Sequence, residues 1–443
     1  MKYTIALITV ILFSFLLPEI DNQPDFYLGG IQVNEPDNKV WVQTLKKVGM
    51  NTVSVTVYAK QGDWDSDNLW FDEKNEGVVN EIRVAKEEGL AVVLILRVAL
   101  DHAFERNKFL WHGMIMPKTN QLDSWFNKYS KFVKQWAEIA EDENIDVFVI
   151  GSEMNALTAT SKIDSLTPLL EYYLNDIKQK QYKSKILKYN DTLASKHLWV
   201  RGFDNYKNSK AYLEAKIATN KKWATQVCYS DTGNINQINI SREYLNKKWE
   251  ELIKQTKELY SGNITYAANF DNYQEVGFWK DLNFIGINAY FPLRKYQPII
   301  SDTVKRTLFL NAWDSIFMEI DSFRIDNQLN NNPVIFTELG YTYRKNSTIE
   351  PWGAAGFSVL GDSSNSHLMV WDEQEVDQTE RAMAVNTLYK THLKKPDLLK
   401  GILYWKLTTK DYHIPIEPFV LHISEEQTDT LQEELIRFVN QTN

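Results

Sequence analysis

The chain has 443 residues, of which 44% are hydrophobic and 24% charged, so it can bury a large core and is not biased enough in composition to be disordered. Its net charge of −9 argues against nucleic acid and anionic membranes as partners, because both select basic surfaces. Aromatic residues are numerous, with 14 Trp, 22 Tyr and 21 Phe. Their faces can stack on sugars, although most aromatic side chains in any protein belong to the core.

Residues 1–20, MKYTIALITVILFSFLLPEI, have the pattern of a secretory signal peptide or an N-terminal anchor. Lys2 precedes an apolar run from Thr4 to Leu17, and Pro18 follows it. The run is shorter than the ~20 residues of a membrane span and fits the apolar region of a signal peptide. We therefore predict a secreted or periplasmic protein whose folded part covers 24–443, with membrane anchoring through an uncleaved segment as the alternative. The only cysteine is Cys228, so no intramolecular disulfide is expected.

Eight nearly continuous apolar runs alternate with amphipathic stretches along the rest of the chain. Such runs are typical of parallel strands covered on both faces. Eight of them, with helices between, predict an α/β fold of the (β/α)8 TIM-barrel type. A doubly wound open sheet is the competing arrangement, but no glycine-rich phosphate loop follows the first strand. The predicted strands are 26–33, 51–58, 91–98, 146–153, 263–270, 283–290, 333–340 and 401–407.

The connection after the fourth predicted strand is far longer than a barrel requires. Glu153 and Asn263 are 110 positions apart (263 − 153 = 110), whereas a loop with its helix needs far fewer. We predict that the polar, lysine-rich segment 155–240 is a helical insertion and that the barrel helix itself is 242–260. Because the insertion leaves the carboxyl end of a strand, it should form one wall of the substrate face. An interaction platform is the alternative role.

Two predicted strands end in a glutamate, Glu153 in DVFVIGSE and Glu338 in PVIFTELG. Functional groups of a barrel lie at the carboxyl ends of its strands, so the carboxylates of strands four and seven should converge. Glycoside cleavage needs such a pair: one carboxyl protonates the leaving oxygen and the other attacks or stabilises the anomeric centre. Either glutamate alone could be a salt-bridged strand end. The two together favour glycoside hydrolysis.

Further polar and aromatic residues stand at strand ends or in the loops after them, and we predict that they bind substrate. No metal or cofactor is predicted. Segment 63–74 begins like a calcium loop but has Asn68 and Lys74 where glycine and glutamate are needed, so a solvated turn is favoured. The histidines lack the spacing of metal ligands. The predicted substrate-binding residues are Tyr58, Arg97, Trp111, His112, Asn269, Asn288, Tyr290, Tyr341, Trp352 and Trp405.

Several stretches resemble glycoside hydrolase family 113, a β-mannanase family of clan A, and more distantly the barrel-like domain of phage-type tail proteins. They are YAANFDNYQEVGFWKDLNFIGINAYFPL, PVIFTELGYTYR, EQEVDQTERAMAV and GILYWKL. The resemblance covers residues 26–410 apart from the insertion. It implies that Glu338 is the nucleophile of a retaining double displacement. It also implies that Glu153 is the general acid/base, with its pKa raised so that it starts protonated.

The resemblance implies roles for the surrounding residues as well. Tyr290 and Tyr341 would hydrogen-bond the nucleophile or hold the sugar, and Trp405 would form the floor beneath it. Asn269 and Asn288 would contact sugar hydroxyls. The resemblance also implies that Arg97 orients one of the two glutamates.

The chain departs from the family pattern at two positions. Ser152 stands where clan A has an asparagine that holds a sugar hydroxyl. LWHGMI places His112, a titratable group, where relatives have a Trp-Arg-Gly turn.

We therefore expect an exported retaining glycoside hydrolase that acts on β-1,4-linked mannan or manno-oligosaccharides without a cofactor. One alternative is a non-hydrolytic carbohydrate-binding or assembly protein on the same barrel, since a fold does not by itself fix a function. The other is a β-glycosidase of different sugar specificity. In each case the expected partner is an oligo- or polysaccharide, and no membrane contact is expected beyond the N-terminal segment.

Overall fold

The structure, a computed structural model, describes residues 23–72, 75–158, 177, 209–227, 235–295, 300–352, 357–360, 368–371, 375–426 and 429–440. The predicted signal or anchor at 1–20 and most of the predicted insertion at 155–240 lie outside these residues. Among the helices that are described, none combines the length and the apolar character that crossing a membrane requires.

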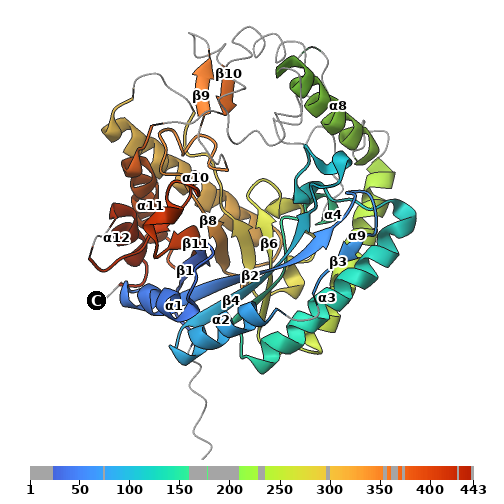
Figure 1. Ribbon diagram of the computed structural model, residues 1–443, viewed down its shortest axis with the longest axis horizontal. Helices are drawn as coiled ribbons and strands as arrows, with labels where there is room; N and C mark the ends of the chain where they lie inside the picture. The colour runs from blue at the N-terminus through green and yellow to red at the C-terminus, as the bar shows by residue number, and fades with distance from the viewer. Residues whose placement is uncertain are drawn as a thin grey trace, which may run out of the picture.

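Eight parallel strands form a closed barrel. Each strand pairs with its neighbours in order around the ring, and β1 pairs with both β2 and β11, which closes it (Figure 1). The predicted (β/α)8 fold is thereby confirmed, and every predicted strand overlaps an observed one. The barrel strands are β1 (Tyr27–Gln32), β2 (Thr52–Gln61), β4 (Ala91–Leu100), β5 (Val147–Ser152), β6 (Asn263–Asn269), β7 (Ile285–Asn288), β8 (Val334–Leu339) and β11 (Leu399–Thr408).

Helices surround the barrel, and short elements lie in its loops. Asp37 shows how one helix begins: its carboxylate accepts hydrogen bonds from the backbone N–H groups of Lys39 and Val40 at the start of α1. Gly49, with φ at +90°, follows the end of that helix. The helices are α1 (Asn38–Lys47), α2 (Glu76–Glu87), α3 (Leu122–Asp142), α4 (Asn155–Thr158), α8 (Ser209–Val227), α9 (Ile235–Lys257), α10 (Asp302–Asp326), α11 (Gln378–His392) and α12 (Thr430–Ile436).

The remaining elements are short strands and single 3-10 turns. Figure 1 shows β9 and β10, and separately α8, at the end of the barrel toward which its strands point. These elements are β3 (Leu69–Trp70), β9 (Phe357–Leu360), β10 (Leu368–Trp371), β12 (Leu421–His422), η1 (Glu105–Asn107), η2 (His112–Met114), η3 (Thr119–Gln121), η7 (Tyr273–Glu275), η8 (Trp279–Asp281) and η9 (Asp411–His413).

The alternation of side chains along each strand divides the core into two parts. In β4, Val92, Leu94 and Leu96 pack outward in a large shell between the barrel and the helices. Val93 and Ile95 pack inward with a smaller cluster that fills the barrel. Because successive side chains point to opposite faces, the next inward position of β4 is Arg97, at the carboxyl end. The strand pattern thus places this cation above the apolar filling of the barrel.

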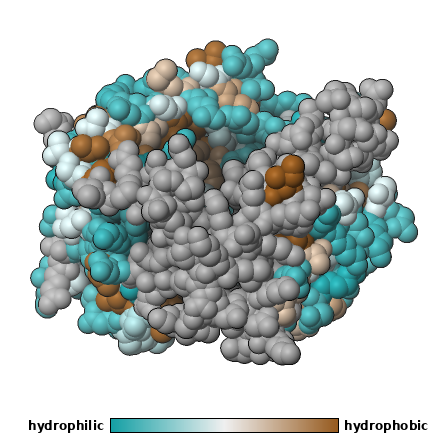
Figure 2. Space-filling model, turned by 90° about the horizontal axis from the view of Figure 1, so that it is seen from above, coloured by the Kyte–Doolittle hydropathy of each residue, from teal (hydrophilic) through white to brown (hydrophobic). Residues whose placement is uncertain are grey.

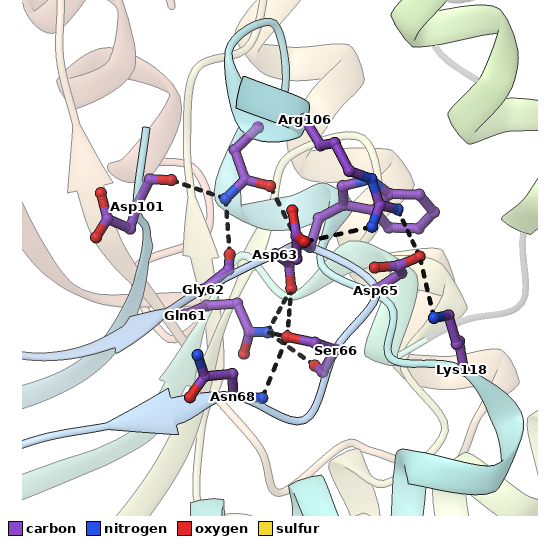
Figure 3. A network of polar contacts seen from close by, with 11 residues as sticks. Gln61, Gly62, Asp63, Asp65, Ser66, Asn68, Asp101, Arg106 and Lys118 are labelled. Carbon is purple, nitrogen blue, oxygen red and sulfur yellow. Dashed lines mark hydrogen bonds and ion pairs between the residues drawn. The ribbon is translucent and has the colours of Figure 1, made fainter. Parts of the chain in front are cut away.

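In the described part of the predicted turn at 63–74, partly buried ionic contacts hold the chain, as Figure 3 shows from close by. Arg106 donates to a carboxylate oxygen of Asp65 at 2.5 Å and to Asp63 at 3.3 Å. Asn107 donates to the backbone carbonyls of Gly62 and Asp101 at 2.6 and 2.7 Å. These contacts join the loop after β2 to the loop after β4, so both loops are fixed at the carboxyl end of the barrel.

Candidate active site

The two predicted glutamates lie at the carboxyl end of the barrel, the end on which Figure 2 looks down. Where described atoms are visible there, hydrophobic patches lie among hydrophilic ones. Glu153 directly follows β5, and Glu338 is the penultimate residue of β8. Both side chains are buried, with 9% of Glu153 and 2% of Glu338 exposed.

An irregular end of β5 aims Glu153 into the site. The pairing of β5 with β6 shifts register between Val149 and Ser152, and such irregularities redirect side chains. Gly151 packs so closely that an added Cβ would lie 3.1 Å from the Tyr129 hydroxyl. Glu153 itself has φ at +53°, a left-handed conformation that costs a non-glycine residue about 1–3 kcal/mol. The surrounding structure therefore holds this side chain in a strained orientation.

Each carboxylate oxygen of Glu153 has a partner from a different element. Oε1 accepts a hydrogen bond from Asn288 Nδ2 at 2.9 Å, and Oε2 lies 2.8 Å from His112 Nε2. The Asn288 amide is oriented in turn by the Thr337 hydroxyl, which donates to its Oδ1 at 2.8 Å. Asn288 therefore orients the predicted acid/base through its amide, and its contact with a sugar hydroxyl stays a prediction.

Glu338 is bound by a cation and a hydroxyl. Arg97 Nη2 forms a short ion-pair contact with Oε1, and the Tyr290 hydroxyl donates to Oε2 at 2.6 Å. Charge-assisted hydrogen bonds of this kind are among the strongest in proteins. They fix the carboxylate in one orientation and favour its ionised form.

The hydroxyl of Ser152 connects the two carboxylate sites. It accepts hydrogen bonds from Arg97 Nη2 at 3.2 Å and from Asn288 Nδ2 at 3.3 Å. Arg97 also contacts Glu338, and Asn288 also contacts Glu153. A continuous chain of polar contacts therefore runs from one glutamate to the other, and the serine that replaces the family's asparagine lies at its centre.

The expected upward shift of the pKa of Glu153 is wrong for the free protein. Burial raises the pKa of this carboxyl, but the hydrogen bond and charge of His112, the charge of Arg97 and the hydrogen bond from Asn288 together lower it to about 2. The sequence does not show this result, because every cause that lowers the pKa comes from a side chain that the fold brings to Glu153: His112, Arg97 or Asn288. Glu153 is therefore ionised in the free protein at neutral pH.

Three predicted aromatic residues line the site without contacting either carboxylate. Trp405 packs against the cluster inside the barrel, and the Arg97 guanidinium lies 5.1 Å from the centre of its ring. Tyr58, on β2, is 47% exposed, and Trp111 is 36% exposed and packs edge-on against His112. Their exposed faces are available to the apolar faces of a sugar.

Two further predicted residues, Asn269 and Trp352, both contact Phe270. Asn269 ends β6, and Trp352 lies in the loop after β8. The Trp352 ring stacks on Phe270, with centres 5.4 Å apart and planes at 14°, and remains 41% exposed. Asn269 precedes Phe270 and accepts a hydrogen bond from its backbone N–H at 3.1 Å. This pair of rings is a second aromatic surface, supported from below by the edge-on contact between Phe270 and Phe291.

Tyr341 was predicted to bind the nucleophile or the sugar, but its side chain lies away from the carboxylates. Its side chain is fully buried in the shell between barrel and helices, and its hydroxyl has no hydrogen-bond partner. The backbone carbonyl of Tyr341 accepts from the Tyr404 hydroxyl at 3.0 Å. Tyr341 therefore belongs to the core, and Tyr290 alone of the two tyrosines binds Glu338.

Asp271 was missed by the sequence reasoning. It follows β6, and burial by neighbouring atoms, opposed by a backbone hydrogen bond and aided by the charge of Glu153, raises its pKa to about 6. The charge of Glu153 acts on Asp271, which places the two carboxyls in one electrostatic environment, although Asp271 is exposed to solvent. Asp271 could have been identified from the sequence by its place after an apolar strand, the criterion that identified Glu153 and Glu338.

The loop that carries His112 is also held by the helix α8. Trp223, buried on α8, donates its indole N–H to the backbone carbonyl of Met114 at 2.7 Å. Met114 is the last residue of the turn η2, which begins at His112. The part of the predicted insertion that the structure describes thus contacts the loop bearing a partner of Glu153.

Neither a metal centre nor a second binding site is found in the part of the chain that the structure describes. Over the residues described, no three His, Cys, Asp or Glu side chains are placed together in a way that could hold a metal ion. A depression at the opposite end of the barrel is lined by Arg324, Lys394, Lys395 and Lys400, among others. Each of these cations pairs with an aspartate, which is consistent with a structural role.

The model of Glycoside Hydrolase Family 113 matches residues 32–164 and 165–383, most of the chain. The chain belongs to this family. It is therefore a glycoside hydrolase, in agreement with the paired carboxylates at the ends of β5 and β8. The further resemblance to phage-tail barrel domains stays a prediction.

Solved structures of the same family share the fold. The GH113 β-mannanase AaManA from Alicyclobacillus acidocaldarius, in complex with ManMIm, is 13% identical, with a TM-score of 0.57 over 94% of this chain and 98% of that one. A GH113 β-1,4-mannanase is 15% identical, with a TM-score of 0.57 over 95% of this chain and 100% of that one. No curated protein sequence matches the chain.

Proposed function

We propose that the protein cleaves β-1,4-mannosidic linkages of mannan or manno-oligosaccharides with retention of configuration. The observation that carries this proposal is the polar chain joining Glu153 and Glu338 through Arg97, Ser152 and Asn288. Two buried carboxylates with different partners are the arrangement that a double displacement needs. The choice of mannan rests on the two structural neighbours described as β-mannanases.

In the proposed reaction Glu338 attacks the anomeric carbon and forms a glycosyl-enzyme. Arg97 and Tyr290 hold its two oxygens before attack, so the nucleophile enters the reaction ionised and oriented. Glu153 delivers a proton to the leaving oxygen and, in the second step, removes one from the attacking water. Trp405 would lie beneath the sugar, next to the Arg97 guanidinium.

The stacked rings of Phe270 and Trp352 support an elongated substrate. Trp352 leaves a large part of its ring open, and an exposed aromatic face is a typical platform for a sugar. Asp271, the next residue after Phe270, is coupled to the charge of Glu153, so this part of the site adjoins the proposed acid. We assign the rings to the binding of the leaving portion of the chain.

A carbohydrate-binding protein that does not hydrolyse its ligand is the second candidate, favoured by one observation. With its pKa lowered to about 2, Glu153 holds no proton to give to a leaving group at neutral pH. If nothing returns that proton when the sugar binds, the site would bind without cleaving. The two functions differ in whether any product appears.

The test is hydrolysis of mannohexaose and cellohexaose, each with a labelled reducing end, by the wild type and by Glu338→Ala. Proton NMR during the first turnovers follows the anomeric configuration of the products. We expect cleavage of mannohexaose with the β configuration retained, and at least about a 10⁴-fold loss in the variant. Cleavage with inversion would overturn the double displacement. Binding of mannohexaose without any cleavage would establish the second candidate instead.

Export through residues 1–20 is part of the proposal and rests on Lys2 and the apolar run after it. Expression of the full chain in a bacterial host, followed by fractionation and mass spectrometry of the intact product, tests it. A product outside the cytoplasm that lacks its first residues is expected. A full-length product in the membrane fraction would indicate an uncleaved anchor.

A further inference from the structure

The contact between His112 and Glu153 raises a question that the proposed function leaves open. Glu153 must carry a proton to act as an acid, yet its surroundings favour the ionised form. His112 Nε2 lies 2.8 Å from Oε2, and 23% of the His112 side chain is exposed, so the imidazole is in reach of both the carboxylate and solvent. Histidine changes charge near neutral pH, unlike arginine or lysine.

We propose that His112 is a positioning residue that stores the proton which Glu153 donates, so that the pair titrates as one unit with a single shared proton. This rests on the proposed glycoside hydrolysis. The other oxygen of Glu153 is occupied by the Asn288 amide, which can donate a hydrogen bond but cannot take up or release a proton. Among the described groups that contact Glu153, only His112 can therefore exchange a proton with it near neutral pH.

The proton balance of the proposed cycle is closed. Protonated His112 gives the proton on Nε2 to Oε2 of Glu153, leaving a neutral imidazole and a neutral carboxyl. The carboxyl gives this proton to the glycosidic oxygen, which also takes the electron pair of the breaking C–O bond, while Glu338 bonds to the anomeric carbon. Water then gives a proton to Glu153 as its oxygen displaces Glu338. That proton returns to His112.

The other charged and titratable groups around the pair come from every neighbouring element. Arg97 on β4 carries a fixed charge and pairs with Glu338 on β8. Asp271, after β6, and Tyr290, after β7, are both influenced by the charge of Glu153. The hydroxyl of Tyr266 on β6 accepts a hydrogen bond from the backbone N–H of Met154 at 2.7 Å. None of these groups contacts Oε2, so none replaces His112.

Coupling fixes the direction in which a substitution moves the pH profile. A pair that shares one proton loses it at a higher pH than Glu153 would alone, because two sites can hold the proton in place of one. The basic limb of kcat/KM should therefore move to lower pH when His112 can no longer accept a proton. His112→Gln keeps an amide donor for Oε2 and removes only the proton site.

The experiment measures kcat/KM against pH for the wild type, His112→Gln and His112→Arg, with mannohexaose as substrate. Both variants should shift the basic limb by about one pH unit or more toward acid, because neither side chain releases a proton in this range. His422→Gln is the matched control. It also breaks a histidine–carboxylate contact, with Asp411 at 2.9 Å, but outside the site.

A second substrate distinguishes a loss of proton storage from a general loss of activity caused by misfolding of the variant. A dinitrophenyl β-mannoside has a leaving group that departs without protonation, so His112→Gln should lose little activity on it and much more on mannohexaose at pH 7. Equal losses on both substrates, or profiles lowered at every pH with an unmoved basic limb, would overturn the proposal. A wild type that cleaves neither substrate would instead overturn the proposed function on which it rests.

Discussion

Glu153 and Glu338 occupy equivalent places at the ends of two strands of one barrel, but their partners are of different kinds. Glu338 is held by Arg97, whose charge does not change at any ordinary pH, and by the Tyr290 hydroxyl. Glu153 is held by His112, whose charge can change, and by the neutral amide of Asn288. The nucleophile thus has a permanent counter-charge, and the acid has a titratable one.

The difference matches what each carboxylate must do. A nucleophile has to be ionised at the start of every cycle, so a fixed cation suits it. A general acid/base must gain and lose a proton in each cycle, and a partner that can exchange one allows this. The same fold thereby gives two chemically identical side chains separate tasks through their neighbours.

The largest expected effect comes from changing the fixed partner. Arg97→Lys keeps the charge but loses the planar guanidinium that serves Glu338 and Ser152 together. We expect kcat to fall by about 10²–10³ on mannohexaose. Arg83→Lys is the control, because Arg83 pairs with Glu143 on the outer surface. Activity within tenfold of the wild type would show that charge alone suffices for the nucleophile.

A smaller effect is expected in the pH dependence of stability. The folded-state pKa of Glu153, about 2, is below the ordinary value of 4.5, so ionised Glu153 stabilises the fold above pH ~4.5. That contribution is lost as the pH falls through about 2. Glu153→Gln should therefore lower the free energy of unfolding by up to about 3 kcal/mol at pH 7, with the difference narrowing in acid.

Urea unfolding of the wild type and Glu153→Gln at several pH values measures this difference. Glu425→Gln serves as a control, since the exposed pair of Glu425 with Lys47 should contribute less than about 1 kcal/mol. A difference between wild type and Glu153→Gln that does not change with pH would contradict the assignment of an ionised Glu153 to the free protein.

The smallest effect is expected at the second partner of the nucleophile. Tyr290→Phe removes one hydrogen bond to Glu338 and nothing else that the described contacts reveal. A hydrogen bond to a charged group contributes about 1.5–3 kcal/mol, so kcat should fall by about 10–100-fold. Tyr341→Phe is matched to it, because the Tyr341 hydroxyl has no partner and its loss should leave kcat unchanged. Similar losses in both variants would place Tyr341 in the site after all.

The sequence predicted the barrel well because each strand is a nearly continuous apolar run, and such runs leave little choice of conformation. Glu153 and Glu338 were identified from their places at strand ends, because a carboxylate that follows an apolar run is costly to bury unless it is paired or functional. Short strands such as β3 and β12 were not predicted. Each has two residues, and their pairing depends on neighbours that no local pattern reveals.

The site was predicted less completely, and the missing parts all depend on tertiary contacts. His112 was identified as a departure from the family pattern, but its contact with Glu153 joins residues 41 positions apart and left no sign in the sequence. The resemblance implied a raised pKa for Glu153 and a role for Arg97 beside one glutamate, but the contacts of His112 and Asn288 with Glu153, which lower that pKa, could not be foreseen. Tyr290 and Tyr341 each stand two residues after the end of a barrel strand. Which of the two side chains faces the inside of the barrel depends on the strand register, which the sequence alone does not reveal.

The hydrogen bond from Trp223 to the carbonyl of Met114 links the helix α8 of the predicted insertion to the turn that carries His112, and His112 contacts Glu153. If α8 is shortened or replaced, the turn that begins at His112 loses this hydrogen bond, and we expect the pH dependence of activity to change as a result. If the insertion were grafted onto a family member that lacks a histidine at this position, we expect the pH dependence of its activity to stay unchanged.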